Sequence, residues 1–293
     1  IQMKNISKQE LNISADELMQ RFVRGETSRN TEGSGLGLSI ASSLTELQGG
    51  QFHIYLDGDL FKVTIGLPVY NAGKYLKDCV QSILNQTYKN IEIIILNDGS
   101  SDNSFEIVNG FNDSRILYID DGLNKGLVFR LNQMVKIASG DFFVRMDADD
   151  IMFPDRIEQQ LNVFKQYPNT DIVHGSAISI DESNSILGLK LAASQITREN
   201  VLNGIIPIHP TVMGKKEWFL QNEYASDFYL MEDFELWYRT SSSSAFKNTS
   251  IPVLFYRELS QNNSFKYLKM IPSKREFARR YTLSYPFKIK FIY

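Results

Sequence analysis

The chain has 293 residues, of which 43% are hydrophobic, and it carries a formal net charge of −3 at pH 7. Its length exceeds one typical domain, and the weak negative charge argues against nucleic acid as the main partner. The single cysteine, Cys79, excludes a disulfide framework, and no apolar run approaches the roughly 18 residues of a membrane-spanning helix. We therefore expect a protein of a reducing compartment, with no secretory signal.

Residues 1–62 carry a glycine-rich pattern. The motifs are Phe22-Val23-Arg24-Gly25, Gly33-Ser34-Gly35-Leu36-Gly37-Leu38-Ser39-Ile40, a helix to Leu47, and strand-like runs at 51–56 and 60–65. They resemble the C-terminal third of the ATP-binding domain of sensor histidine kinases, whose glycine-rich loop lets backbone N–H groups approach phosphates at a helix start. That family's Mg²⁺-binding asparagine helix and adenine-binding turn would precede residue 1. We therefore expect a truncated fragment or fusion that does not use ATP.

The junction after this fragment is ambiguous, because residues 62–68 resemble both the last strand of the kinase domain and the first strand of the next domain. One strand cannot be central to two sheets. Since the next domain is complete, we expect the strand to join its sheet. Residues 1–60 would then keep an apolar face that either packs on the next domain or is exposed.

From residue 63 onward, strand-like and helical patterns alternate. Apolar runs lie at 63–69, 91–96, 115–119 and 142–146, and helical patterns lie at about 75–84 and 126–138. The alternation predicts a parallel sheet with right-handed crossovers, whose ligands bind beyond the carboxyl ends of the strands. Tyr70, Asp98 and the acids from Asp147 to Asp149 fall at such ends.

The acidic run Asp147-Ala148-Asp149-Asp150 directly follows the last of these strands. Carboxylates packed this closely repel one another unless a cation lies among them, and Mg²⁺ or Mn²⁺ prefers such oxygen ligands and often brings diphosphate. A solvated turn is the alternative interpretation of the tetrapeptide by itself. The neighbouring motifs favour the metal.

Five motifs resemble the ordered motifs of family 2 glycosyltransferases of the GT-A fold. They are Pro68-Val69-Tyr70-Asn71, Asn97-Asp98-Gly99-Ser100-Ser101-Asp102, Asn124-Lys125-Gly126 with Asn132, Asp147-Ala148-Asp149-Asp150 with Pro154-Asp155-Arg156, and Glu232-Asp233-Phe234-Glu235-Leu236-Trp237. The resemblance covers about residues 62–260 and implies an α/β fold, a Rossmann-like, mostly parallel sheet flanked by helices.

The implied domains are an N-terminal α+β fragment at 1–62, a catalytic domain at 63–260 and a helical tail at 261–293. The catalytic domain would divide into a nucleotide-binding half, 63–150, and an acceptor half, 151–260.

The resemblance also implies a donor site. The residues assigned to the donor are Pro68, Tyr70, Asn71, Asp98, Lys125, Arg130 and Asp147, with Asp149 assigned to the metal. Tyr70 would pack on the nucleotide base and Asp98 would accept from its edge, while Asp147 would face the ribose. Asp149 would hold Mn²⁺ or Mg²⁺ against the phosphates. Lys125 and Arg130 are phosphate candidates, with ordinary surface cations as the alternative.

The acceptor side is implied by two further motifs. Residues 205–213 form a strand-like region broken by prolines, in which His209 would contact the acceptor or the diphosphate, unless it is a structural histidine. Glu232 and Asp233 open an amphipathic helix whose Phe234 and Trp237 point inward. The family's catalytic base occupies this acidic pair. We expect Asp233 to be the base, because adjacent helical residues point about 100° apart and the resemblance favours the second acid.

The C-terminal part departs from the family in one place and adds one pattern. Many relatives carry a histidine after the Tyr-Arg pair, whereas this chain has Tyr256-Arg257-Glu258-Leu259. In the tail, Lys274, Arg275, Arg279 and Arg280 alternate with Phe277, Tyr281, Tyr285 and Phe287. This basic and aromatic pattern suits a membrane surface, and a helix packed on the core with snorkelling cations is the alternative.

The sequence thus predicts an inverting, metal-dependent glycosyltransferase acting in cell-surface polysaccharide synthesis. It would move a sugar from a nucleotide-diphosphate donor, a UDP-sugar in first place, to a glycan or lipid-linked acceptor. We expect a cytoplasmic location, with peripheral contact at the inner face of the membrane through the tail. The rival functions are an ATP-binding sensor kinase fragment and a non-catalytic fusion scaffold.

Overall fold

The computed structural model describes residues 37–50, 52, 61–259 and 263–281. The chain divides into two compact units, Ile1–Leu60 and Phe61–Tyr293. In the first unit the described structure consists mainly of the helix α2 (Gly37–Leu47), which ends where the sequence predicts. The Phe22 motif, the start of the glycine-rich loop and nearly all of the run at 51–56 lie outside the described residues.

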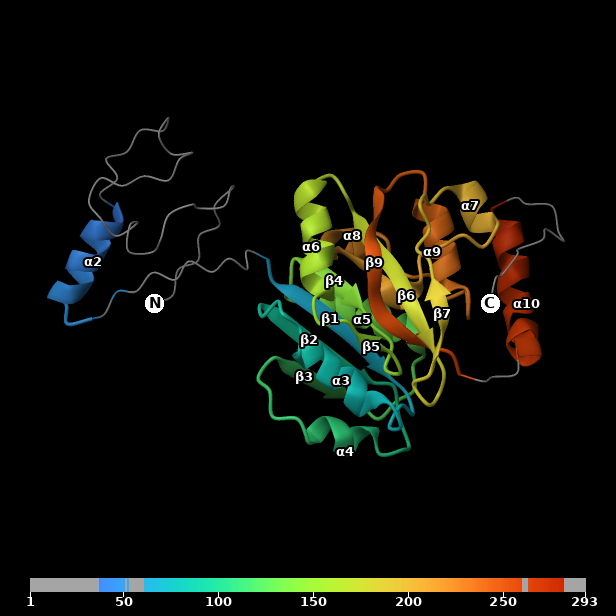
Figure 1. Ribbon diagram of the computed structural model, residues 1–293, viewed down its shortest axis with the longest axis horizontal. Coiled ribbons are helices and arrows are strands. Elements are labelled where there is room, and N and C mark those ends of the chain that lie inside the picture. The colour runs from blue at the N-terminus through green and yellow to red at the C-terminus, as the bar shows by residue number, and fades with distance from the viewer. Residues whose placement is uncertain (1–36, 51, 53–60, 260–262, 282–293) are drawn as a thin grey trace. The chain divides into compact units, whose positions relative to one another are not determined.

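The second unit is built around a nine-stranded sheet (Figure 1). Its strands are β1 (Val63–Val69), β2 (Ile91–Asn97), β3 (Ile116–Asp120), β4 (Phe142–Arg145), β5 (Ile151–Met152), β6 (Ile172–Ile180), β7 (Ile186–Lys190), β8 (Met213–Lys215) and β9 (Phe246–Arg257). The strand order is β3-β2-β1-β4-β8-β6-β9-β5, and β7 pairs with β6.

Helices flank this sheet. They are α3 (Leu76–Leu84), α4 (Ser104–Asn109), α5 (Leu127–Ile137), α6 (Arg156–Gln166), α7 (Arg198–Leu202), α8 (Lys216–Gln221), α9 (Glu232–Thr240) and α10 (Asn263–Arg280), with a 3₁₀ turn, η2, at His209–Thr211.

The first half of the sheet is parallel, as the alternating pattern predicts. β1 lies between β2 and β4 and is parallel to both, with Leu67 opposite Ile95 and Gly66 opposite Arg145. β3 continues the parallel arrangement beyond β2. The strand at the ambiguous junction therefore belongs to this sheet, and the carboxyl ends of β1, β2 and β4 meet at one edge.

The second half of the sheet is mixed. β8 is antiparallel to both β4 and β6, while the long strand β9 runs parallel to β6. The short strand β5, which begins right after the acidic run, is antiparallel to β9. The result is a mixed, mostly parallel sheet flanked by helices, which confirms the predicted fold class.

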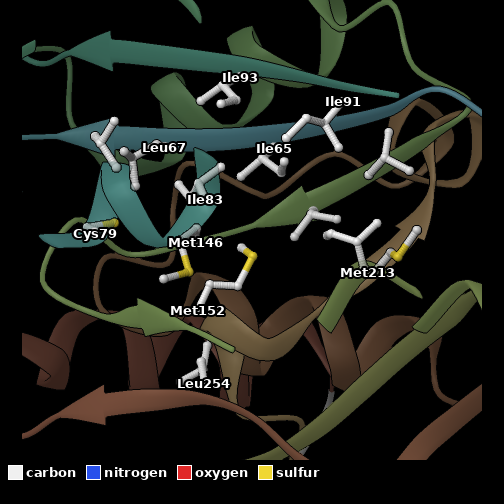
Figure 2. Close-up of a cluster of buried hydrophobic side chains, with 14 of the residues drawn as sticks. Ile65, Leu67, Cys79, Ile83, Ile91, Ile93, Met146, Met152, Met213 and Leu254 are labelled. Carbon is white, nitrogen blue, oxygen red and sulfur yellow. The ribbon is translucent and has the colours of Figure 1, made fainter. Parts of the chain in front are cut away.

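Two apolar clusters lie on opposite faces of the sheet. One joins β1 and β2 to α3 and α6, and Figure 2 shows part of it, with Ile65 and Leu67 of β1 near Cys79 and Ile83 of α3. The other joins α5, α8, α9 and α10 to the opposite face. Because side chains of β-strands alternate between faces, β2 contributes Ile93 to the first cluster and Ile94 and Leu96 to the second.

The segment at 205–213 differs from the prediction. No strand forms at 205–208; η2 follows, and β8 begins only at Met213. Pro207 and Pro210 explain the difference, because proline lacks the N–H that a sheet ladder needs and fixes its own φ near that of a turn.

The tail helix α10 packs on the second cluster. Phe277 is fully buried and contacts the rings of Phe228 and Phe234. Arg280 pairs with Asp227 at 2.6 Å. The described part of the tail thus matches the alternative of a helix packed on the core. Tyr285 and Phe287 lie outside the described residues.

Candidate active site

The turns that follow β1 and β2 are bonded to each other. Asn71 has a left-handed backbone, φ 49°, and its side-chain oxygen accepts from the Ser101 N–H at 2.8 Å. Its own N–H donates to the Ser100 hydroxyl at 2.9 Å. Pro68 lies within β1 opposite Leu96, and Tyr70 extends from this edge with 57% of its surface exposed. Tyr70 therefore offers a free ring face beside a fixed turn.

The Asp98 carboxylate is buried and surrounded by donors. It accepts from the backbone N–H of Lys125 at 2.7 Å and of Gly126 at 3.0 Å, and from Arg130 Nε at 2.8 Å. Gly126, with φ 83°, caps α5 in a conformation that favours glycine. Asp98 thus fixes the start of α5 in addition to facing the sheet edge.

The two cations proposed for phosphate contact are already paired. Arg130 is fully buried, and besides Asp98 its guanidinium binds Asp121 at 2.7 Å. Lys125 Nζ also binds Asp121, at 2.7 Å. Hydrogen bonds from Arg130 and Lys125 lower the pKa of Asp121. These contacts favour a structural role for Arg130, while the partly exposed Lys125 could still exchange Asp121 for a phosphate.

The acidic run forms a compact cluster. Single carboxylate oxygens of Asp147, Asp149 and Asp150 all lie within 4.8 Å of one another. Burial, reinforced by the charge of Asp147, raises the pKa of Asp149 to about 6 and that of Asp150 well above its usual range. Asp150 Oδ2 is buried and has no hydrogen-bond partner among the described residues. Such oxygens fit a hard divalent cation, and Asp147, expected at the ribose, and Asp150 join Asp149 as candidate ligands.

Arg257, at the end of β9, is hydrogen-bonded to this acidic turn. Its backbone N–H donates to Asp150 Oδ1 at 2.8 Å, and its Nε donates to the carbonyl oxygen of Asp149 at 2.8 Å. Its guanidinium also lies 4.2 Å from the ring centre of Tyr75. In the sequence, the Tyr256-Arg257 pair marks only the place of an absent histidine, so this role of Arg257 was missed.

Arg145, the last residue of β4, is a second candidate functional residue that the sequence pattern did not predict. It is almost fully buried and forms an ion pair with Asp147. Its Nε has no hydrogen-bond partner in the described part of the chain. A buried, incompletely bonded guanidinium beside an acidic cluster offers positive charge to the site. An arginine inside an apolar run was the available signal.

The acidic pair that opens α9 consists of the buried Glu232 and the half-buried Asp233, and both carry raised pKa values. Burial and the charge of Asp233 raise the pKa of Glu232 to about 7, with Arg145 acting in the opposite direction. Burial also raises the pKa of Asp233, whose Oδ1 accepts from the Phe234 N–H at 2.7 Å. Both carboxyls sense the charges of Arg145 and Asp147, so the pair lies within electrostatic range of the acidic turn.

His209 is a buried, hydrogen-bonded side chain whose ring lies against Trp237 of α9. Its Nε2 is 2.9 Å from the hydroxyl of Tyr224, and burial together with the charge of Arg145 lowers its pKa well below the usual value. Tyr224 is in turn held by Asn132, whose amide exchanges two hydrogen bonds with the Tyr224 backbone, at 2.9 and 3.0 Å. The contact of His209 with acceptor or diphosphate stays a prediction, and its bond to Tyr224 favours the structural interpretation.

Comparison with known proteins identifies this arrangement. The sequence profile of "Glycosyl transferase family 2" matches residues 64–235. Glycosyltransferase GlyG of Streptococcus pneumoniae is 34% identical over 151 residues, which are 48% of this chain and 49% of that protein. The chain thus spans about half of GlyG, and less of several other curated relatives.

Two solved structures share the fold. Residues 1–349 of TarS from S. aureus, in complex with UDP-GlcNAc, align with a TM-score of 0.59 at 15% identity, covering 69% of this chain and 60% of that one. The mannosyltransferase PcManGT of Pyrobaculum calidifontis, in complex with GDP-Man and Mn²⁺, aligns with a TM-score of 0.54 at 15% identity, covering 83% and 70%. The sheet and its helices are thus those of GT-A glycosyltransferases.

Proposed function

The chain belongs to glycosyl transferase family 2, and from this premise we propose that it transfers a sugar from a nucleotide-diphosphate donor, with a divalent metal and with inversion at the anomeric carbon. The observation that carries the proposal is that two clusters of acidic side chains lie near each other. The acidic turn Asp147–Asp150 and the pair Glu232–Asp233 lie within electrostatic range of each other, with Arg145 acting on both.

The donor would bind across the carboxyl ends of β1, β2 and β4. Tyr70 would stack on the nucleotide base, and the remaining lone pairs of Asp98 would accept from its edge. The donor nucleotides bound in TarS and PcManGT support this class of ligand. A UDP-sugar is our first choice, and the acceptor would be a glycan or a lipid-linked sugar of a cell-surface polysaccharide.

Asp149, with Asp147 and Asp150, would hold Mn²⁺ or Mg²⁺. The unpartnered Oδ2 of Asp150 and the crowded carboxylates support this fit, because a bound cation would remove their mutual repulsion. The metal would neutralise the charge that grows on the leaving diphosphate. Arg257 would keep the turn in shape through its bonds to Asp149 and Asp150.

Asp233 would act as the general base. The acceptor hydroxyl would lose its proton to this carboxylate while its oxygen attacks the anomeric carbon, and the bond to the diphosphate oxygen would break on the opposite face. The N–H of Phe234 orients the Asp233 carboxylate. Glu232, with a pKa of about 7, would be partly protonated near neutrality and would border the acceptor.

Thermal unfolding of the full chain tests the donor and metal together. UDP- or GDP-sugar with Mn²⁺ should raise the melting temperature, and Asp149→Asn should abolish the metal-dependent part of the shift while the fold stays intact. Asp78→Asn, an exposed acid on α3, is the matched control. An unchanged Mn²⁺-dependent shift in Asp149→Asn would sink the metal assignment, and stabilisation by an ATP analogue instead would favour the kinase-like function of residues 1–62.

Peripheral membrane contact through the tail remains part of the proposal. None of the helices in the described part of the chain has the length and apolarity to cross a bilayer. In α10, the Arg279 side chain is 75% exposed, so its guanidinium would be accessible to anionic lipid if it exchanged Glu276 for a headgroup. Vesicle binding that does not depend on anionic lipid would remove this part of the proposal.

A further inference from the structure

A groove runs along the surface between α5 and the segment that leads into α9. Its volume is about 710 Å³, which lies within the usual range for small-molecule sites. Leu127, Phe129 and Ile137 line it from α5, and Tyr229 and Leu230 line it from the opposite side. Phe129 and Tyr229 are 49% and 58% exposed. Aromatic side chains gathered in one concave surface mark a binding site more often than scattered ones do.

The groove is continuous with the proposed active site at one end. Glu232, the first acid of the catalytic pair, is one of its lining residues. Lys125 and Gly126 line it as well, and their N–H groups are the ones that hold Asp98. A molecule lying in the groove would therefore reach the acid pair and the donor turn without leaving the protein surface.

The wall of the groove is held in a defined shape. Leu230 has a left-handed backbone, φ 60°, which costs a branched side chain free energy and persists where the surroundings enforce it. Ser273 of α10 donates its hydroxyl to the Tyr229 carbonyl at 2.9 Å. Asn132 and Tyr224 tie α5 to the opposite segment. Backbone strain at Leu230 and hydrogen bonds from α5 and α10 indicate a built site rather than a gap in packing.

The polar groups of the groove are largely engaged by the protein. Lys136 pairs with Glu223 at 2.8 Å and Lys125 with Asp121 at 2.7 Å, while the Asn132 amide is bonded to Tyr224. A glycan chain would need free hydrogen-bonding partners along its length, because each buried hydroxyl without one costs free energy. The remaining surface is apolar, so an apolar occupant fits it better than a row of sugars.

We propose that this groove binds the apolar aglycone of the acceptor, an alkyl or isoprenoid chain attached to the sugar that receives the transfer. The chain would lie between Phe129 and Tyr229, and the sugar hydroxyl would then point to the Glu232–Asp233 pair. The proposal rests on the proposed function and narrows its acceptor to the lipid-linked class.

The proposal is tested by comparing how tightly the full chain binds n-octyl β-glucoside and methyl β-glucoside. Saturation-transfer NMR measures both affinities, with octyl glucoside kept below its micelle concentration. Octyl glucoside should bind at least tenfold more tightly than methyl glucoside. Phe129→Ser and Tyr229→Ser should each remove most of that difference. Phe105→Ser is the matched control, because Phe105 of α4 is also 49% exposed but lies away from the groove.

Equal affinities for the two glucosides would overturn the proposal, as would an octyl preference that survives in Phe129→Ser or is lost equally in Phe105→Ser. Sedimentation velocity of the same samples provides a second check. If Phe129→Ser converts a dimer to a monomer, the groove is an interface between copies and the proposal is wrong. Binding of a UDP- or GDP-sugar with Mn²⁺, measured on the same protein, separates the failure of this proposal from the failure of the proposed function. If the protein prefers octyl glucoside but does not bind the donor, the proposed function is wrong and the apolar site still stands.

Discussion

The carboxylate of Asp98 and those of the pair Glu232–Asp233 have very different surroundings. Asp98, at the end of β2, accepts from two backbone N–H groups and from the fully buried Arg130. The pair Glu232–Asp233, at the start of α9, is desolvated with far fewer donors, and burial raises the pKa of both. The first arrangement holds a carboxylate in a fixed position with its charge balanced, and the second leaves carboxyl groups ready to exchange a proton.

The acidic turn Asp147–Asp150 lies between these extremes. Arg257 and Arg145 satisfy part of its charge, yet the pKa of Asp149 and Asp150 is still raised by burial and by their neighbours. Negative charge that the protein balances only in part suits a site that binds a positively charged ligand such as a metal ion. The contrast therefore separates carboxylates whose charge the protein itself balances from carboxylates whose charge it leaves partly unbalanced, and each prediction below tests that separation.

The largest effect is expected at Asp233. Asp233→Asn should lower the transfer rate by about 10² to 10⁴, the range for a positioned general base, with little change in donor affinity or in the midpoint of unfolding. Steady-state kinetics and calorimetry with donor measure the two quantities. If Glu232→Gln is inactive while Asp233→Asn is close to wild type, the roles within the pair are reversed.

Arg130 should matter to stability rather than to chemistry. Arg130→Met leaves the Asp98 and Asp121 carboxylates without their shared guanidinium, and breaking a buried ion pair of this kind costs about 3 kcal/mol of unfolding free energy. Urea unfolding provides the measurement. Arg279→Met is the control, because Arg279 forms an exposed pair with Glu276 and the substitution should change stability far less. Equal stability of the two variants would contradict a scaffold role for Arg130.

Glu232 should destabilise the metal-free protein at high pH. Its pKa is about 7 in the folded state against an ordinary 4.5, so the folded state binds the proton more tightly. That advantage is present below pH 4.5 and is lost as the pH rises through 7. Glu232→Gln should therefore gain about 1–3 kcal/mol relative to wild type between pH 5 and pH 8.

Urea unfolding with a chelator at the two pH values tests this prediction for Glu232. A difference between Glu232→Gln and wild type that does not change with pH would show that the acid pair is as well compensated as Asp98.

Tyr70 should have the smallest effect, confined to ligand binding. Because its ring is 57% exposed, Tyr70→Ala should leave stability unchanged. Loss of one stacking contact should weaken binding of UDP with Mn²⁺ by about tenfold, measured by calorimetry. Tyr167→Ala removes a comparably exposed ring, 43%, at the end of α6. Identical UDP affinities in these two variants would exclude stacking of Tyr70 on the nucleotide base.

The parallel half of the sheet could be predicted because its signals are local. The buried runs of β1, β2 and β4 are nearly continuous apolar segments, which is the pattern of strands covered on both faces. Each run ends at a site turn, so the positions of Tyr70, Asp98 and Asp149 at one edge follow from the topology alone.

The remaining features depend on partners far apart in the chain. Asn132 and Tyr224 are 92 residues apart, and β6 pairs with β9 from a distant segment. Arg145 lies inside an apolar run, where its charge gives no hint that Asp147 and the acid pair surround it. No local pattern encodes such contacts, and the same holds for the short strands β5 and β7. The sequence could therefore predict the candidate acids but not the cations that lie near them.

The hydrogen bonds from Arg257 to the acidic turn affect the order in which parts of the protein can fold during synthesis. Arg257 follows Asp150 by 107 residues, and a ribosome that adds roughly 5–20 residues per second needs roughly 5–20 s to reach it. Until then the parallel half can form, but its acidic turn has neither its hydrogen bonds to β9 nor the pairing of β5 with that strand. The acidic turn therefore reaches its final shape only after residue 257 has been synthesised.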